Sequence, residues 1–282
     1  MASPAERIAH ARAVLAGAGI AEQDAALDAE VLARHALSWD RSTLLAHGRE
    51  PAPPGFDAAF DALLARRLRR EPIAQVVGHR EFWGLEFDVT SDVLTPRPET
   101  ELIVEEAIGF AREFSFRRAV DVGTGSGCIA VCIAHELPDL HVTATDSSEP
   151  ALAIAVRNAT RHGVAHRMSF VRTDLTDGIG GPFDLIVSNP PYIPEGNAAN
   201  LPPEVLQFEP HTSLFGGVDG LAIIRRLLSD TPSSLAPKGR LIIEFGLGQE
   251  EDVRRLAHEM GWRMLRVRND LQGIPRTAVL EL

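Results

Sequence analysis

The tetrapeptide Asn189-Pro190-Pro191-Tyr192 combines residue types that can hold a planar amino group. It directly follows the apolar run 183–188, which has the character of a buried strand. Asn189 offers an amide oxygen and Pro190 a carbonyl on a backbone made rigid by two successive prolines, so both can accept hydrogen bonds from one NH₂ group. Tyr192 supplies a ring face for stacking. We therefore take Asn189, Pro190 and Tyr192 as candidate catalytic residues and Pro191 as a further substrate contact; the alternative is a rigid turn with a core tyrosine.

A second candidate site is the glycine-rich segment after the apolar run 118–122. Glycines in such a loop allow a tight turn and a close approach of the backbone to a ligand at the start of the next helix. The spacing is Gly-x-Gly-x-Gly, preceded by Asp121, and Cys128 stands where a dinucleotide fingerprint requires glycine. A plain turn is the alternative reading. The residues expected to bind a cofactor here are Gly123, Thr124, Gly125, Ser126 and Gly127.

Acidic residues end the next two expected strands. Asp146 can accept hydrogen bonds from both hydroxyls of a ribose, or it can cap the helix that follows it. Asp174, followed by Leu175, is placed to meet an adenine amino group, or it is a solvated loop residue. With Asn189 at the end of the fourth strand, these turns predict a pocket for an adenosine-bearing ligand at the carboxyl ends of the strands.

Strands and helices alternate from about residue 99 onward. This order predicts a parallel sheet with right-handed crossovers. The last two strands follow one another without a helix and should pair antiparallel at one edge. The expected fold is therefore α/β, a Rossmann-like seven-stranded sheet that is mostly parallel with one antiparallel edge strand. The expected strands are 118–122, 141–145, 168–172, 183–188, 240–245, 262–268 and 276–282, with helices near 126–136, 149–162, 220–230 and 249–260.

The first 72 residues have the pattern of a small helical domain. Ser3 with Pro4 and Glu6 forms a capping box, and Asp40 can cap a later short helix. The period changes after residue 73, and partial alternation over 82–89 predicts a β-hairpin. We expect a helical domain, a hairpin with its connector, and a catalytic domain, over residues 1–72, 73–98 and 99–282.

The charge of the chain argues against a polybasic nucleic-acid binder. The formal net charge is −11, from 28 basic and 39 acidic residues. Residues 1–84 contain 10 basic and 11 acidic side chains and residues 85–282 contain 18 and 28, so the acidic excess lies in the second segment. We expect no direct nucleic-acid binding, because such binding draws on many phosphate contacts by lysine and arginine.

The two cysteines indicate core packing in a reducing compartment. Cys128 and Cys132 are four residues apart in an apolar stretch and lack the partners of a four-ligand zinc site, so we expect no metal. The first residues lack the pattern of a secretory signal, and no apolar run approaches the length of a membrane span. A cytoplasmic location without membrane contact is the resulting expectation.

Nearly the whole chain resembles a class I S-adenosylmethionine-dependent methyltransferase and, more narrowly, the HemK/PrmC family of release-factor glutamine methyltransferases. The tetrapeptide at 189–192 is shared with adenine and other amino-group methyltransferases, and two segments, 80–84 and 96–101, narrow the choice. Three positions depart from the family pattern: Thr95, His211 and Val218. The segments that carry the resemblance are 71–74, Arg80-Glu81-Phe82-Trp83-Gly84, Pro96-Arg97-Pro98-Glu99-Thr100-Glu101, 123–127, Asn189–Tyr192, Glu209-Pro210, 216–221 and 270–276.

The resemblance implies an activity in translation termination. The methyl group of S-adenosyl-L-methionine would pass to the side-chain amide nitrogen of the glutamine in the Gly-Gly-Gln motif of class I peptide-chain release factors, leaving S-adenosyl-L-homocysteine. It also implies that Arg97 and Glu209 contact the substrate, and that Arg97 and Glu99 help to close the connector over the site or make a purely structural contact.

Three other functions remain open from the sequence. An adenine amino-group methyltransferase acting on DNA or RNA would use the same clamp. A non-catalytic nucleotide-binding protein could keep the fold without turnover, and a nicotinamide-dependent enzyme is disfavoured by Cys128.

Overall fold

The chain folds into two compact units. The computed structural model describes residues 2–282. The helical unit comprises residues 2–78 together with 202–208, and the sheet unit comprises 79–201 and 209–282. The first unit differs from the expected domain of residues 1–72 in two ways. It also contains a helix at 73–77, and it includes the segment 202–208. None of the helices in residues 2–282 is both long and apolar enough to cross a membrane.

The helical unit is held together by an apolar core to which its longest helices contribute. Ser3 accepts a hydrogen bond from the Glu6 amide and the Glu6 carboxylate accepts one from the Ser3 amide, so the expected capping box is present. Asp40 caps the third helix through the Thr43 amide, as expected. The fully buried rings and chains include Leu15, Leu32 and Phe60. The helices are α1 Pro4–Gly17, α2 Glu22–Leu37, α3 Arg41–His47, α4 Phe56–Leu68, α5 Ile73–Val77 and α9 Pro203–Phe208.

The sheet unit contains the expected seven-stranded sheet. Its strand order is β5-β4-β3-β6-β7-β9-β8. The pairs from β5 to β7 are parallel, and β9 is antiparallel to both of its neighbours. The last two strands thus form the expected antiparallel pair at one edge, with β9 inserted beside β7 and β8 outermost. The strands are β3 Arg118–Val122, β4 His141–Asp146, β5 Met168–Arg172, β6 Phe183–Ser188, β7 Leu235–Glu244, β8 Arg263–Asn269 and β9 Pro275–Glu281.

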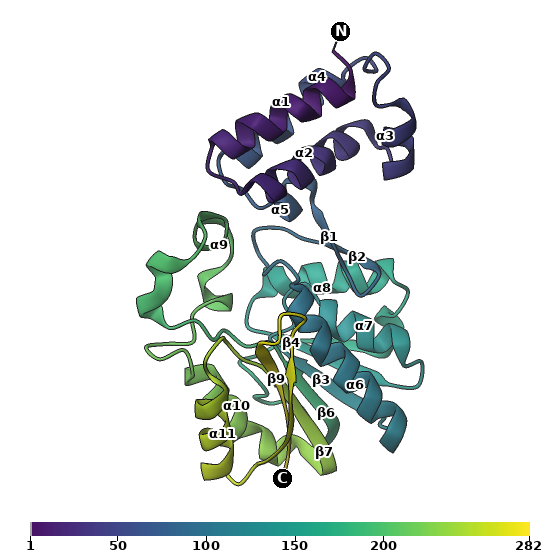
Figure 1. Cartoon of the computed structure of the whole chain (residues 1–282). Coiled ribbons are helices and arrows are strands. Elements are labelled where there is room, and N and C mark those ends of the chain that lie inside the picture. Colours follow the sequence, from purple (N-terminus) through teal and green to yellow (C-terminus); the bar gives the residue numbers. More distant parts are fainter. Residues whose placement is uncertain (1) are drawn as a thin grey trace. The chain divides into compact units, whose positions relative to one another are not determined.

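Helices cover both faces of this sheet (Figure 1). Alternate residues of β3 point to opposite faces: Ala119 packs with α6, α7 and α8, whereas Val120 packs with α10 and α11. Both faces of the central strands are therefore buried, as a parallel sheet requires. The helices of this unit are α6 Glu101–Phe114, α7 Cys128–Glu136, α8 Glu149–Arg161, α10 Ala222–Asp230 and α11 Glu250–Glu259.

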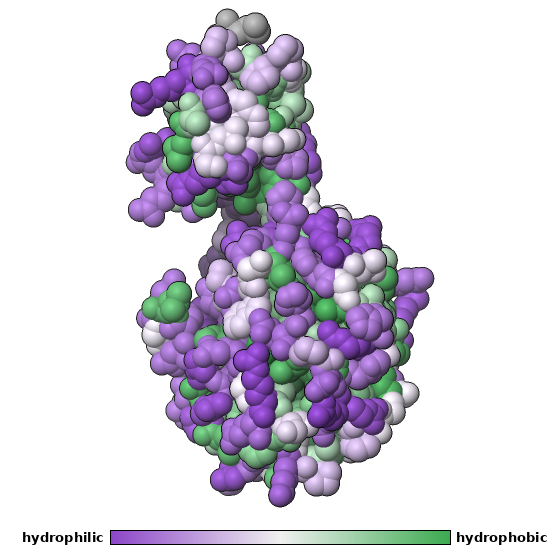
Figure 2. Space-filling view, turned by 90° about the vertical axis from the view of Figure 1, so that its right-hand side faces the viewer, coloured by the Kyte–Doolittle hydropathy of each residue, from purple (hydrophilic) through white to green (hydrophobic). Residues whose placement is uncertain are grey.

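The expected hairpin is present and begins at His79, three residues before the alternating pattern over 82–89. It consists of β1 His79–Phe82 and β2 Leu85–Asp88, joined at Trp83 and Gly84, which both have positive φ. The Trp83 amide donates to Glu101 of α6 at 2.8 Å, which anchors the turn to the sheet unit. Outside the buried cores, hydrophilic side chains predominate on the face of the molecule that Figure 2 shows.

Candidate active site

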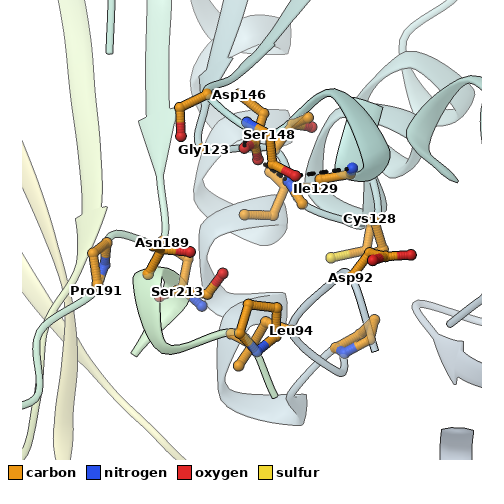
Figure 3. A pocket seen from close by; sticks show the side chains of 18 of the residues that line it. Asp92, Leu94, Gly123, Cys128, Ile129, Asp146, Ser148, Asn189, Pro191 and Ser213 are labelled. Carbon is orange, nitrogen blue, oxygen red and sulfur yellow. Dashed lines mark hydrogen bonds between the residues drawn. The ribbon is translucent and has the colours of Figure 1, made fainter. Parts of the chain in front are cut away.

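A cavity of about 190 Å³ lies at the carboxyl ends of the parallel strands. Because parallel strands present these ends at one edge, the loops after β3, β4, β5 and β6 all reach it. In Figure 3, Asn189 and Ser213 lie on one side of the cavity and Asp92 and Cys128 on the other. Its lining includes every residue of 123–126, Asp146, Asp174, Leu175, Asn189 and Pro191, with Asp92, Leu94, Thr95, Pro96, Arg97 and Thr100 from the segment 92–100.

The glycine loop owes its shape to backbone conformations that side chains disfavour. Gly123, Gly125 and Gly127 have φ of 72°, 56° and 80°. A Cβ at Gly127 would also lie 3.0 Å from the Cβ of Ala155 in α8, whereas the other two glycines have no such neighbour. The first two glycines are therefore required only for their positive φ. The third is required for its positive φ and also because the loop packs closely against α8.

Asp146 joins the second turn of the site to the first. Its Oδ2 accepts a hydrogen bond from the Gly125 amide at 2.9 Å, and its Oδ1 accepts one from the Ser148 amide at 2.9 Å. Ser148 itself caps α8. Asp146 therefore does more than the alternative reading of a helix cap requires. Its carboxylate also holds the glycine loop through the Gly125 amide, and Asp146 lines the cavity.

Asp121 is a buried acid beneath the glycine loop. Its Oδ2 accepts from the Thr124 hydroxyl at 2.7 Å and from the Ala130 amide at 3.2 Å, whereas its Oδ1 has no partner. Burial raises the pKa of Asp121 to about 7. The carboxyl group thus supports the loop and keeps one unused acceptor oxygen. Its place two residues before the first glycine was the signal available in the sequence.

The third turn brings Asp174 and Leu175 to the cavity. Asp174 lines the cavity, but its Oδ2 accepts a hydrogen bond from Arg226 of α10 at 2.9 Å. Leu175 adopts a positive φ of 53°, and its carbonyl accepts from the Thr145 hydroxyl at 3.0 Å. A non-glycine residue in this region stores strain that surrounding contacts must offset, a feature that concentrates at functional sites.

The residues of 189–192 have different surroundings. Asn189 and Pro191 line the cavity. Pro190 is buried and is not in the lining, and the Tyr192 ring packs against the core on the α10 and α11 face. The Tyr192 hydroxyl donates to Glu244 at 3.1 Å, and burial raises the pKa of Tyr192. The Tyr192 hydroxyl thus has a structural partner, and Tyr192 is not among the residues that line the cavity.

Three glycines form the floor on which this turn rests. A Cβ at Gly216 would lie 2.5 Å from the Pro191 carbonyl oxygen, and one at Gly246 would lie 3.0 Å from the Tyr192 ring. A Cβ at Gly220 would collide with the Tyr192 carbonyl oxygen. Gly216 and Gly220 are therefore required because two backbones approach each other closely at these positions.

Arg97 and Glu209 are brought together by the fold. Arg97 Nη2 donates to Glu209 Oε2 at 2.6 Å, and the Thr95 amide lies 3.4 Å from Glu209 Oε1. The Glu209 side chain is 1% exposed and does not line the cavity, whereas Arg97 does. Glu209 thus holds Thr95 and Arg97 in place, and Arg97 is the member of the pair that lines the cavity.

The cysteines are buried and unpaired, as expected. Burial raises the pKa of Cys128 to about 12, so its thiol is neutral at physiological pH. Within residues 2–282 no group of three or more His, Cys, Asp and Glu side chains could hold a metal ion.

Several residues that line the cavity were not predicted from the sequence. Asp92 and Leu94 come from the connector, and Thr212 and Ser213 from the segment before the glycine floor. Asp92 had a signal, since it is an acidic residue just before the proline-rich connector. Thr212 and Ser213 had none, because their proximity depends on how the chain returns after α9.

Two family models match the chain. The PrmC N-terminal domain matches residues 6–78, and the methyltransferase small domain matches residues 99–202. Among solved structures, the hMettl16 catalytic domain in complex with an RNA hairpin has a TM-score of 0.56 at 18% identity, covering 77% of this chain and 79% of that one. A methyltransferase from Pyrococcus furiosus has a TM-score of 0.52 at 19% identity, covering 77% and 95%. These two likenesses support the methyltransferase fold.

Curated relatives are much more similar in sequence. The release factor glutamine methyltransferase of Cereibacter sphaeroides is 44% identical over 262 residues, which is 93% of this chain and 92% of that protein. Those of Bordetella pertussis and Geobacter sulfurreducens are 43% and 42% identical, and the matches cover 92% of each. With this identity along almost the full length and both family domains present, the chain belongs to the release factor glutamine methyltransferases.

Proposed function

We propose that this chain methylates the side-chain amide nitrogen of the glutamine in the Gly-Gly-Gln motif of class I release factors, using S-adenosyl-L-methionine. The observation that carries the proposal is that Asn189 and the glycine loop line one cavity. A cofactor held by the loop and an amide held by Asn189 would therefore share that space. The adenine amino-group alternative is not favoured, because the relatives of 42–44% identity carry the release factor name.

The chemistry of the lining suits this cofactor. The charged side chains of the lining are three carboxylates, Asp92, Asp146 and Asp174, and one guanidinium, Arg97. S-adenosyl-L-methionine carries a sulfonium, an ammonium and only one carboxylate, so an acidic site attracts it. Asp146 offers carboxylate oxygens to ribose hydroxyls, and Asp121 keeps an unpartnered buried oxygen near the loop. When bound, this cofactor supplies an electrophilic methyl group on sulfur.

Asn189 would act by orientation and by stabilising charge. An amide nitrogen is a poor nucleophile because its lone pair is shared with the carbonyl. The Asn189 side-chain oxygen and the Pro190 carbonyl would accept the two amide hydrogens, which directs the lone pair and favours a nitrogen that becomes partly positive during transfer. The proton leaves readily once the nitrogen is alkylated, so the chain needs no general base before transfer.

The helical unit would grip the body of the release factor. The cavity can read only one side chain, so recognition of a whole protein requires further surface. Removing residues 1–70 should therefore lower kcat/KM for the intact release factor while leaving turnover of a short Gly-Gly-Gln peptide less affected. Equal activity of the full chain and the truncated chain on intact release factor would refute this role.

The decisive experiment is transfer of labelled methyl to purified release factor, followed by mass mapping of the Gly-Gly-Gln peptide. We expect one added methyl on the glutamine, and none when that glutamine is replaced by glutamate in a matched release factor. Label in DNA or RNA, or label on the release factor outside this glutamine, would contradict the proposal.

A further inference from the structure

A chain of hydrogen bonds connects Asn189 to a buried glutamate. Asn189 Nδ2 lies 3.0 Å from the Thr100 hydroxyl, and that hydroxyl lies 2.7 Å from Glu244 Oε2. The Tyr192 hydroxyl lies 3.1 Å from the other oxygen of Glu244. The first and the last residue of the 189–192 turn are thus both linked to the Glu244 carboxylate at the end of β7. Tyr192 binds it directly, and Asn189 is linked to it through Thr100, which immediately precedes α6.

The direction of each hydrogen bond follows from the chemistry of the groups. An ionised carboxylate only accepts, so both the Thr100 and the Tyr192 hydroxyl donate to it. Burial raises the pKa of Glu244 to about 7, even though the bonds from Thr100 and Tyr192 oppose that rise, so the ionised form predominates above this pH. Glu244 is 1% exposed and Thr100 is 2% exposed, so water does not replace either partner.

This direction determines which end of the Asn189 amide meets Thr100. A hydroxyl has one proton, and that of Thr100 is committed to Glu244. Toward Asn189 it can then only accept, so it pairs with the NH₂ end of the amide. The amide oxygen of Asn189 is left for a ligand in the cavity. With the Thr100 proton free, an amide turned by 180° would hydrogen-bond equally well and would present NH₂ to the cavity.

We propose that Thr100 and Glu244 are positioning residues that set the orientation of the Asn189 amide so that its oxygen faces the substrate. This inference rests on the proposed role of Asn189 in holding the substrate amide. It also gives the connector segment 96–101 a function beyond joining two parts of the chain, because Thr100 is the residue through which the connector reaches the turn at 189–192.

The central test compares Thr100→Val with Thr100→Ser at pH 8.5, where Glu244 is ionised. Valine keeps the shape but removes the hydroxyl, and serine keeps the hydroxyl. We expect Thr100→Val to lower kcat by about 10- to 100-fold with the Kd for S-adenosyl-L-methionine within about 3-fold, and Thr100→Ser to retain most activity. Wild-type kcat in the valine variant, or equal loss in both variants, would overturn the proposal.

A second test asks whether Glu244 acts on Asn189 through Thr100. Glu244→Gln should lower kcat in the wild-type background but should add little in the Thr100→Val background, because the glutamate acts through Thr100. Additive losses in the double variant, or no loss from Glu244→Gln alone, would refute a shared path.

A readout without turnover separates this proposal from the proposed function. In ¹⁵N-labelled protein, the side-chain amide signal that disappears in Asn189→Ala belongs to Asn189. We expect its protons to exchange slowly in wild type and in Thr100→Ser, and rapidly in Thr100→Val. Unchanged exchange in the valine variant would overturn the hydrogen-bond chain even if release factor is the substrate. If wild type failed to methylate release factor, slow exchange lost only in the valine variant would still support it.

Discussion

Arg67 and Glu204 are 137 residues apart in the sequence, and Arg67 Nη1 donates to Glu204 Oε1 at 3.0 Å. The same guanidinium donates through Nε to the buried Asp28 at 2.6 Å, and Arg70 donates to Glu204 at 2.9 Å. Gln75 adds a hydrogen bond of 3.1 Å to the Phe208 carbonyl. The segment that follows the 189–192 turn is therefore an integral part of the helical unit.

Glu204→Ala should lower the free energy of unfolding of the helical unit by about 1–3 kcal/mol, because it removes the carboxylate that accepts hydrogen bonds from both Arg67 and Arg70. The side chains of Arg67 and Glu204 are only 6% and 17% exposed. Glu22→Ala is the matched control, since the Arg12–Glu22 pair is 50% and 75% exposed. Urea denaturation should show a change within about 0.5 kcal/mol for the control, and similar effects of the two variants would contradict the assignment.

Asn189→Ala should lower kcat by at least about 100-fold, because it removes an acceptor that would strengthen as the substrate nitrogen becomes positive. The affinity for S-adenosyl-L-methionine should stay within a few-fold. Asn197→Ala, an exposed asparagine in the same loop, should keep wild-type turnover. Near wild-type methylation by the Asn189 variant would disprove the clamp.

Asp146→Ala should weaken the binding of S-adenosyl-L-methionine by about 10- to 100-fold, since it removes the proposed ribose acceptor and frees the Gly125 amide. Isothermal titration calorimetry measures this directly. Asp177→Ala, an exposed acid outside the cavity lining, should bind normally. An unchanged dissociation constant in the Asp146 variant would end the ribose assignment.

The buried Asp121 should make the fold less stable as the pH rises. Burial raises its pKa from 3.8 to about 7, so between these values the folded state keeps a proton that the unfolded state has lost. Stability contributed by this group is present below pH 4 and declines up to about pH 7, by at most about 1.4 kcal/mol per pH unit. In Asp121→Asn, urea unfolding should fall less steeply over this range than in wild type. Parallel curves for the two proteins would show that Asp121 does not carry the effect.

Most of the sheet unit could be predicted from the sequence because its strands are apolar runs ended by turn residues. Phe183–Ser188 and Arg118–Val122 begin and end where expected. Helix α9 could not be predicted, since six residues without a buried member show no period, and the contacts that hold it come from α4 and α5. Helix α5 was missed because it is five residues long and lies next to a strand pattern.

The candidate site was predictable where function depends on local backbone, as at Gly123–Gly127 and Asn189. The role of Glu244 was not predicted. In the sequence it is the last residue of an apolar strand, and only the folded chain places Thr100 and Tyr192 next to its carboxylate. A signal existed, since a charged residue directly after Leu241, Ile242 and Ile243 in a buried strand needs partners. Naming those partners required the tertiary structure.

The glycine floor under the 189–192 turn limits how this enzyme could be redesigned. A side chain at Gly216 or Gly220 would collide with backbone oxygens, and one at Gly246 would press on the Tyr192 ring, so substitutions at these positions would displace the turn that they support. The opposite wall, from Asp92 to Arg97, is made of side chains that can be exchanged. Attempts to direct the methyl group to a different amide should therefore vary the connector, leaving the turn and its glycine support untouched.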